Sequence, residues 1–288
     1  MYATITDPST AQEWRVDLLA PADASIPVAP YATEGPGAFG LPRASAAPVR
    51  AGEWVGSVDK GASVNCSTVT LCAHANGTHT ECVGHALGGQ VTLQDVGFCD
   101  HLLCATLLTV VPQDVLSSGD PYPSAKPGDV GITRSCLEAA AAACVPRFSE
   151  AFVLRTAATE AACASLRTRT WSGSNPPYVT GEAMRWLLER GCRHVLVDLP
   201  SVDREDDGGH LVAHSTFWGL APKADRAAAG AGAGGGELCS RTITELVCVP
   251  AALRDGPHLL SLQVAPLAMD AAPSRPLLFP ALEVAKKE

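Results

Sequence analysis

The sequence predicts an α/β fold from three features: short apolar runs of strand length, two segments with helical spacing, and the order in which they follow one another. A helical pattern at residues 181–191 leads into an apolar run at 194–199, and a helix followed by a buried strand is typical of α/β proteins. Hydrophobic residues make up 47% of the 288 and charged residues 18%. This balance is typical of a globular protein and excludes a disordered or fibrous one.

The individual elements can be placed along the chain. Residues 1–60 are rich in Pro, Ala and Gly, and we expect extended chain and turns there. Apolar runs bounded by Gly, Pro and Asp predict strands at 69–72, 103–111, 151–154, 195–197, 243–249 and 259–264. Residues 134–144, with five consecutive alanines, predict a helix. The helix at 181–191 is expected to have Thr180 as its N-cap and to stop at Gly191.

We therefore expect one domain over residues 1–288, with an extended Pro/Gly-rich segment at 1–60 and a flexible insertion at 221–240. The insertion is predicted from the low-complexity run AAAGAGAGGG.

The net charge, the lengths of the apolar runs and the cysteine spacing indicate the partners and the location of the protein. The net charge is −9, with 21 Lys and Arg against 30 Asp and Glu and no basic cluster, which argues against nucleic acid or an anionic membrane as a partner. No apolar run reaches membrane-spanning length, and the N-terminus lacks a signal pattern, so we predict a cytoplasmic protein. The 11 cysteines form no C-x-x-C pair, and we interpret them as mostly reduced.

Three of the eight histidines lie in one short stretch, HANGTHTECVGH, which begins at His74. If the chain is extended at His79 and Glu81, both side chains point to the same face. With His74 brought back by a turn at Asn76-Gly77, these groups could bind a zinc- or manganese-class ion. His85 would lie close enough to act as a general acid or base. The alternative is a surface loop whose polar residues have unrelated roles.

A second polar group lies far downstream. Glu245 falls inside the apolar run at 243–249, and a buried carboxylate costs several kcal/mol unless a cation or a hydrogen bond compensates it. The alternative is an edge strand with Glu245 facing water. The segment at 198–214 holds Asp203, His210 and His214; we interpret His210 as a solvated loop residue. His101, His194 and His258 are expected to be structural or exposed.

The stretch HANGTHTECVGH resembles the H-x-G-T-H-x-D-x-x-x-H signature of the cyclase family, metal-dependent hydrolases that include bacterial kynurenine formamidase. The resemblance extends in order through WSGSNPPY, VDLPSVD, HSTFW and TITEL, over about residues 45–270. It implies a swivelling β/β/α fold, a homodimer or homotetramer, and one or two divalent ions, zinc or manganese.

Position by position, the resemblance implies metal ligands at His79, Glu81, His214 and Glu245, and a proton shuttle at His85. Two departures from the family pattern matter. The first family histidine falls on Ala75, with His74 one residue further back, so a bulge at Asn76-Gly77 would be needed for His74 to serve as the ligand. Glu81 stands where the family has aspartate.

The resulting hypothesis is an arylformamidase-like hydrolase that uses metal-activated water on a small-molecule substrate. It would cleave an N-formyl amide, a cyclic amide or a lactone. One alternative is a catalytically inactive binding protein with the cyclase fold. Another is a thiol or serine hydrolase with Cys82 or Ser201 as nucleophile, although neither lies in a G-x-S-x-G sequence. Candidate pocket walls are the aromatic residues Phe39, Trp54, Trp171, Tyr178 and Trp218.

Overall fold

The computed structural model describes residues 1–6, 11–98, 102–221 and 239–285. Most of the insertion expected at 221–240 therefore lies outside the described residues, as does His101. Among the described helices, none is both long and apolar enough to cross a membrane.

Seven of the described strands close into a ring. The order is β17-β16-β9-β12-β14-β15-β8, and β8 pairs back onto β17. The strands of the ring are β8 (His79–Glu81), β9 (Leu102–Thr109), β12 (Ala151–Arg155), β14 (His194–Val197), β15 (Thr242–Glu245), β16 (Gly256–Val264) and β17 (Ala271–Glu283). The pairs within β9-β12-β14-β15 are parallel and the other pairs in the ring are antiparallel. The fold is thus a mixed α/β fold with a barrel-like sheet.

Alternate residues of the central strands enter two different cores, as the period of a strand requires. Ala151, Val153 and Leu196 pack inside the ring with side chains from β9 and β16. Phe152 and Val195 point outward, where α2 (Arg134–Ala143), α4 (Gly181–Leu188) and α5 (Val212–Trp218) cover the sheet. These strands are buried on both faces, which explains their nearly continuous apolar runs.

Both predicted helices are confirmed. Thr180 caps α4 by accepting a hydrogen bond from the backbone N–H of Ala183, and Thr133 caps α2 in the same way through Cys136. The strand predicted over 243–249 is shorter than expected and ends at Glu245. Leu246 adopts a left-handed φ of 55°, which ends the extended chain directly after the carboxylate, although residues 246–249 remain buried.

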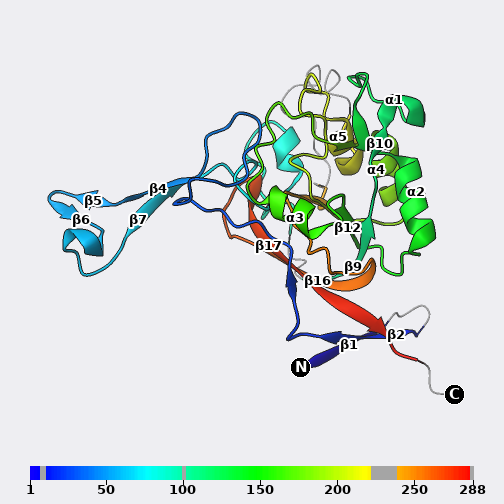
Figure 1. Ribbon diagram of the computed structural model, residues 1–288, viewed down its shortest axis with the longest axis horizontal. Helices are drawn as coiled ribbons and strands as arrows, with labels where there is room; N and C mark the ends of the chain where they lie inside the picture. Colours follow the sequence, from blue (N-terminus) through cyan, green and yellow to red (C-terminus); the bar gives the residue numbers. More distant parts are fainter. Residues whose placement is uncertain (7–10, 99–101, 222–238, 286–288) are drawn as a thin grey trace.

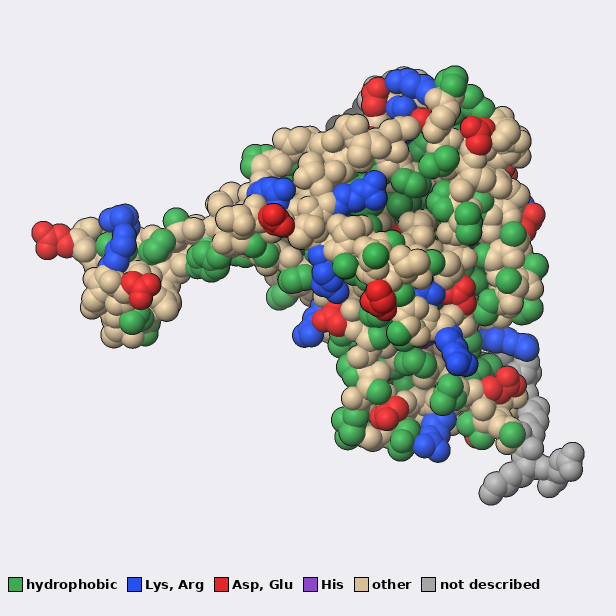
Figure 2. Space-filling model, in the orientation of Figure 1, with side chains coloured by type: hydrophobic (Ala, Val, Ile, Leu, Met, Phe, Trp, Pro, Cys, Tyr) green, Lys and Arg blue, Asp and Glu red, His purple; other side chains and the backbone are tan. Residues whose placement is uncertain are grey.

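The N-terminal segment consists of strands and turns. β1 (Tyr2–Thr6) and β2 (Glu13–Asp17) extend the sheet beside the C-terminal end of β17, and β3 (Ala22–Asp23) pairs with the middle of β17. Residues 45–70, here called the arm, project from the body as a narrow ribbon (Figures 1 and 2). The arm contains β4 (Ser45–Pro48), β5 (Arg50–Ala51), β6 (Trp54–Val55), the 3-10 turn η1 (Val58–Lys60) and β7 (Ser67–Thr70).

The remaining described elements are short. They are η2 (Val83–Ala86), α1 (Val115–Ser118), α3 (Glu160–Leu166) and the small sheet of β10 (Gln113–Asp114), β11 (Val130–Ile132) and β13 (Tyr178–Val179). On the face shown in Figure 2, basic and acidic side chains of the described residues are interspersed rather than gathered by sign.

Candidate metal centre

The centre of the site is the antiparallel pairing of β8 with β15. In this register His79 lies opposite Glu245 and Glu81 lies opposite Ile243. Side chains of directly paired residues point to the same side of a sheet, so one imidazole and two carboxylates gather on one face. Ile243 belongs to the core beneath the helices, which places this face on the helix-covered side of the ring. Thr80 and Thr244 occupy the opposite face, where their hydroxyls are 2.8 Å apart.

The geometry of these buried groups fits a cation. His79 Nε2 lies 3.3 Å from Glu245 Oε2, yet His79 Nε2 makes no hydrogen bond, and neither does Glu81 Oε2. Ligand atoms of His79, Glu81 and Glu245 lie within 4.8 Å of one another, and all three residues are buried. Two atoms each about 2.0–2.2 Å from a shared ion are at most about 4.4 Å apart, so groups at this spacing need only a shift of a few tenths of an ångström to share one ion. A divalent cation would coordinate both of these atoms, which lack hydrogen bonds.

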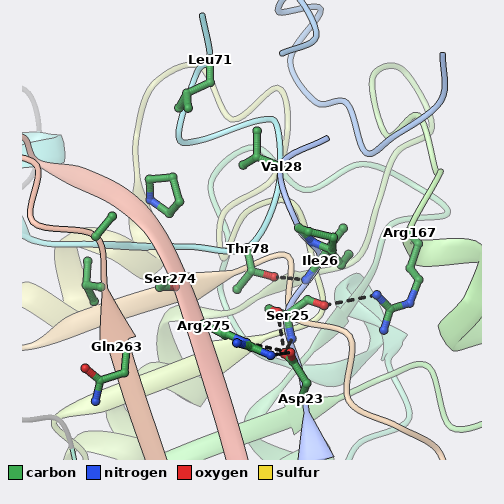
Figure 3. Close-up of a pocket in the computed structure, with 14 residues that line it drawn as sticks. Asp23, Ser25, Ile26, Val28, Leu71, Thr78, Arg167, Gln263, Ser274 and Arg275 are labelled. Carbon is green, nitrogen blue, oxygen red and sulfur yellow. Dashed lines mark hydrogen bonds and ion pairs between the residues drawn. The ribbon is translucent and has the colours of Figure 1, made fainter. Parts of the chain in front are cut away.

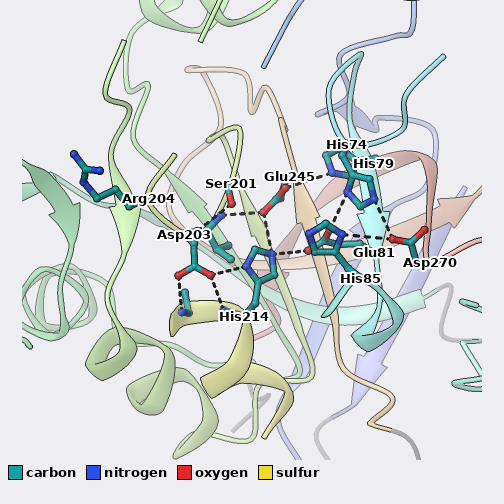
Figure 4. Close-up of polar contacts among 12 residues, drawn as sticks. His74, His79, Glu81, His85, Ser201, Asp203, Arg204, His214, Glu245 and Asp270 are labelled. Carbon is teal, nitrogen blue, oxygen red and sulfur yellow. Dashed lines mark hydrogen bonds and ion pairs between the residues drawn. The ribbon is translucent and has the colours of Figure 1, made fainter. Parts of the chain in front are cut away.

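His214 reaches the same cluster from α5. Its Nε2 lies 2.8 Å from Glu81 Oε1 and 3.7 Å from Glu245 Oε1 (Figure 4). Its Nδ1 donates to Asp203 Oδ2 at 2.6 Å. Asp203 also accepts the backbone N–H groups of Ala213 and His214 in the first turn of α5, so one carboxylate fixes both the helix start and the histidine ring.

His74 reaches the cluster through a turn that follows the arm. The backbone N–H groups of Ala75 and Asn76 both donate to the Cys72 carbonyl, and the Asn76 side chain accepts from the Cys72 N–H. His74 Nδ1 then lies 3.1 Å from Glu81 Oε2. The expected bulge is thus a hydrogen-bonded turn. Gly77 has no left-handed φ; it is needed because a Cβ there would approach the Ile26 carbonyl to 2.8 Å.

His85 lies at the exposed edge of the cluster. It sits in η2, and its side chain is 30% exposed, whereas His79 and Glu81 are fully buried. Its Nδ1 is 3.5 Å from Asp270 Oδ2 and 3.8 Å from Glu81 Oε2. The centroid of its ring lies 4.3 Å from that of His74, with the two ring planes tilted by 38°. Ligand atoms of His74, Glu81 and His85 form a second group of metal-binding size, which shares Glu81 with the buried one.

Asp270 is the site residue that the sequence did not indicate. It precedes β17, and its Oδ2 is 3.1 Å from His74 Nε2. Its backbone carbonyl accepts from the Cys82 N–H, which ties it to the end of β8. An acidic residue immediately before a strand could have been a signal, but the segment at 271–283 contains three prolines and does not have the pattern of an interior strand.

Without a bound cation, the imidazoles carry the positive charge of the cluster. Burial opposes protonation of His74, but its hydrogen bond to Asp270 and its ion pair with Glu81 outweigh burial and raise its pKa to about 10. Burial likewise opposes protonation of His214, but the charge of Glu81 and the hydrogen bond to Asp203 hold its pKa well above the ordinary value. Burial disfavours ionisation of Glu81, but the charges of His85 and His214 hold its pKa well below the ordinary range.

All six predicted site residues are thus brought together by the structure. Glu245 is 3% exposed, so the water-facing alternative for this residue is wrong. Of the candidate pocket walls, Trp218 lies beside the site, with its ring 5.1 Å from that of His214. Like Trp171 and Tyr178, Trp218 is a buried core residue, while Phe39 and Trp54 are exposed. Burial raises the pKa of the Cys82 thiol to about 11, which makes it a poor nucleophile at neutral pH.

A separate groove of about 690 Å³ lies on another part of the ring (Figure 3). It contains none of the clustered histidines and carboxylates. Its acidic group is already paired, because Arg275 Nε donates to Asp23 Oδ2 at 2.9 Å. We therefore assign the candidate site to the His/Glu cluster. The groove is lined by Asp23, Ser25, Ile26, Pro27, Val28, Leu71, Thr78, Arg167, Gln263, Val264, Ala265, Pro273, Ser274 and Arg275.

Comparison with known proteins agrees with this geometry. The cyclase family model, described as "Putative cyclase", matches residues 16–204. No curated protein sequence matches the chain. Among solved structures, one described as a potential metal-dependent hydrolase with cyclase activity aligns with a TM-score of 0.57 at 17% identity, over 90% of this chain and 97% of the other.

Two isatin hydrolase structures have the same fold. The enzyme bound to the product analogue thioisatinate aligns with a TM-score of 0.54 at 13% identity, over 90% of this chain and 92% of the other. Isatin hydrolase A from Ralstonia solanacearum aligns with a TM-score of 0.55 at 13% identity, over 90% and 91%. The fold is therefore that of metal-dependent hydrolases, and the expected swivelling α/β class is confirmed. By its family match, the chain belongs to the cyclase family.

Proposed function

We propose that the protein is a metal-dependent hydrolase that cleaves an N-formyl amide, a cyclic amide or a lactone, in the manner of an arylformamidase. The observation that carries the proposal is the pair of buried atoms without hydrogen bonds, His79 Nε2 and Glu81 Oε2, in a cluster that also holds Glu245 and His214. Each atom faces a group of opposite charge, Glu245 for His79 and His74 for Glu81, but neither makes a hydrogen bond, and a buried polar atom without one has a free-energy cost that a bound cation would offset.

The residues that would hold the cation are His74, His79, Glu81, His214 and Glu245. Imidazole and carboxylate donors suit zinc or manganese. The two oxygens of Glu81 face different histidines, Oε1 toward His214 and Oε2 toward His74, an arrangement that accommodates one ion or two. A divalent ion at such a site lowers the pKa of bound water toward 7 and polarises a carbonyl group.

The protein's own groups prepare the site for that chemistry. The Val202 N–H donates to Glu245 Oε1 at 2.9 Å and fixes the carboxylate. His79 Nδ1 donates to the Gly77 carbonyl at 3.1 Å, so Nε2 is the atom left for the cation. His85 holds Nδ1 toward Asp270, and Nε2 is then the ring atom that exchanges a proton with the leaving nitrogen or oxygen.

The substrate class rests on two supports. The fold is shared with isatin hydrolases, and isatin is a cyclic amide. Trp218, which is 2% exposed and lies beside His85 and His214, makes the core behind the site apolar, and such surroundings suit an aromatic or cyclic substrate.

A hydrolase screen tests the proposal. Purified protein is freed of metal with a chelator, reloaded with Zn²⁺ or Mn²⁺, and assayed against formamides, cyclic imides and lactones. We expect hydrolysis of at least one class that depends on added metal and disappears in His79→Ala. Metal binding without hydrolysis of any class would instead support the inactive binding protein.

The proposal extends to the assembly and location. A two-stranded ribbon is at best marginally stable alone, and the arm exposes Trp54, Val58 and Val64, which supports a homodimer or homotetramer that covers it. Light scattering of the intact protein would show a mass of two or four chains. We propose a cytoplasmic location from the sequence pattern described above.

A further inference from the structure

Two of the histidines in the cluster share one arrangement. His79 offers Nε2 to the cluster while its Nδ1 donates to the Gly77 carbonyl, and His214 offers Nε2 while its Nδ1 donates to Asp203. In each ring the nitrogen away from the cluster has an acceptor. Such partners fix the tautomer and the direction of a ligand imidazole.

His74 has the same arrangement with its nitrogens exchanged. Nδ1 faces Glu81 Oε2 at 3.1 Å, and Nε2 faces Asp270 Oδ2 at 3.1 Å (Figure 4). Asp270 is itself held in place, because its carbonyl accepts from the Cys82 N–H and the next residue, Ala271, pairs with Glu81 across β17 and β8. The carboxylate is thus anchored to the strand that carries two of the other site residues.

We propose that Asp270 is a positioning residue that holds His74 with Nδ1 directed at the metal. The inference rests on the proposed metal-dependent function and deepens it. Asp270 Oδ2 also faces His85 Nδ1 at 3.5 Å, so one oxygen orients both His74, the outer ligand, and His85, the proton shuttle. The centroids of these two rings are 4.3 Å apart.

This role explains how the chain tolerates its departure from the family signature. Ala75, at the position of the family's first histidine, is fully buried in an apolar cluster with Ile26, Trp171 and Leu246, and its side chain is committed to that core. The turn at 72–76 presents His74 instead. A histidine displaced by one residue approaches the cluster from a new direction, and Asp270 supplies the acceptor that fixes it there.

A double-mutant cycle on metal affinity tests the inference. Zn²⁺ dissociation constants are measured by chelator competition for metal-free wild type, His74→Ala, Asp270→Ala and the double variant. We expect Asp270→Ala to weaken Zn²⁺ binding about 10- to 100-fold. Because Asp270 acts through His74, the double variant should bind no more weakly than His74→Ala alone. Losses that add fully, or an unchanged constant in Asp270→Ala, would overturn the inference.

A second measurement guards against a variant that does not fold. In Asp270→Asn the amide oxygen can still accept from His74, so its loss of affinity should be smaller than that of Asp270→Ala, and its Co²⁺ absorption band should shift from the wild-type position. Asp95→Asn, which removes a nearby charge that contacts no histidine of the cluster, is the matched control and should leave the band unchanged. An unshifted band in Asp270→Asn would contradict the inference.

The failure of this inference can be distinguished from the failure of the proposed function. Wild-type protein that binds no Zn²⁺ would overturn this inference and the proposed function together. An unchanged affinity in Asp270→Ala would overturn this inference alone.

Discussion

His79 and Glu245 face each other across two antiparallel strands, with Nε2 and Oε2 3.3 Å apart, although 166 positions separate them in the chain. The pairing of β8 with β15 forces this meeting, and the left-handed turn at Leu246 ends the strand immediately after the carboxylate. Both side chains are buried, and the backbone pairing of the two strands fixes their positions. The pairing therefore holds two ligands of the proposed metal site at a fixed distance from each other.

Asp203→Asn should weaken metal binding. Both oxygens of this carboxylate accept hydrogen bonds, Oδ2 from the His214 Nδ1–H at 2.6 Å and Oδ1 from the Ala213 N–H. An amide must therefore turn its NH2 group toward one of these donors, whereas at Asp270 a single oxygen makes the contacts with the histidines. We expect Zn²⁺ affinity to fall about 10- to 100-fold, measured by chelator competition.

The control is Asp206→Asn, a highly exposed carboxylate in the same loop, which should bind Zn²⁺ like wild type. Equal affinity in the two variants would remove Asp203 from the support of the site.

His85→Ala should separate catalysis from binding. If His85 shuttles a proton, kcat should fall about 100- to 10,000-fold while the metal content per chain is unchanged. Elemental analysis and steady-state kinetics of the same preparation check this. The control is His210→Ala, which changes an exposed loop residue and should leave both kcat and metal content unchanged. Loss of metal would make His85 a ligand in the group it forms with His74 and Glu81.

Metal binding should release protons and become tighter as pH rises. Without a cation, the pKa of His74 is raised to about 10 and that of His214 is well above its ordinary value, so both rings are protonated at neutral pH. A ligand imidazole must be neutral, so binding expels these protons. Calorimetric titration at pH 7 in two buffers of different ionisation enthalpy should give different heats. Identical heats would show that the histidines bind no proton that the metal displaces.

His258, which lies outside the His/Glu cluster, should make the free energy of unfolding depend on pH. Burial lowers its pKa below the ordinary 6.5, aided by the charge of Arg155 and opposed by its hydrogen bond to the Gly256 carbonyl. Between the lowered pKa and 6.5 the unfolded chain binds more protons than the folded one. The stabilising contribution is therefore present above about 6.5 and is lost as pH falls, by up to about 1.4 kcal/mol per pH unit.

Urea unfolding at pH 7.5 and 5.5 checks this for wild type and His258→Gln. The other histidines contribute equally to both proteins, so the difference between the two isolates His258. Wild type should lose more stability than the variant on acidification; parallel losses would contradict the assignment.

The sequence alone predicts the site residues that lie within a recognisable local pattern. His74, His79, Glu81 and His85 lie in one stretch, and Glu245 was indicated by a carboxylate in an apolar run. The helices also followed from their caps and periodicity. These signals are local, and the strand period alone predicts that His79 and Glu81 share a face.

The residues that the sequence did not indicate depend on long-range pairing. Asp270 comes to His74 only because β17 pairs with β8, and the prolines of β17 conceal this strand in the sequence. Asp203 was noted in its segment, but its role as the acceptor for His214 requires the loop to return over the start of α5. The short span of β15 depends on the backbone conformation of Leu246, which residue type does not indicate.

The metal content of Glu245→Gln tests the central claim most directly. The substitution keeps the size of the side chain and the acceptor for the Val202 N–H but removes the charge that a cation requires. Elemental analysis of wild type and variant, purified in parallel, should find at least one Zn²⁺ or Mn²⁺ per wild-type chain and a marked loss in the variant. Wild type without metal, or equal occupancy in both proteins, would contradict the account.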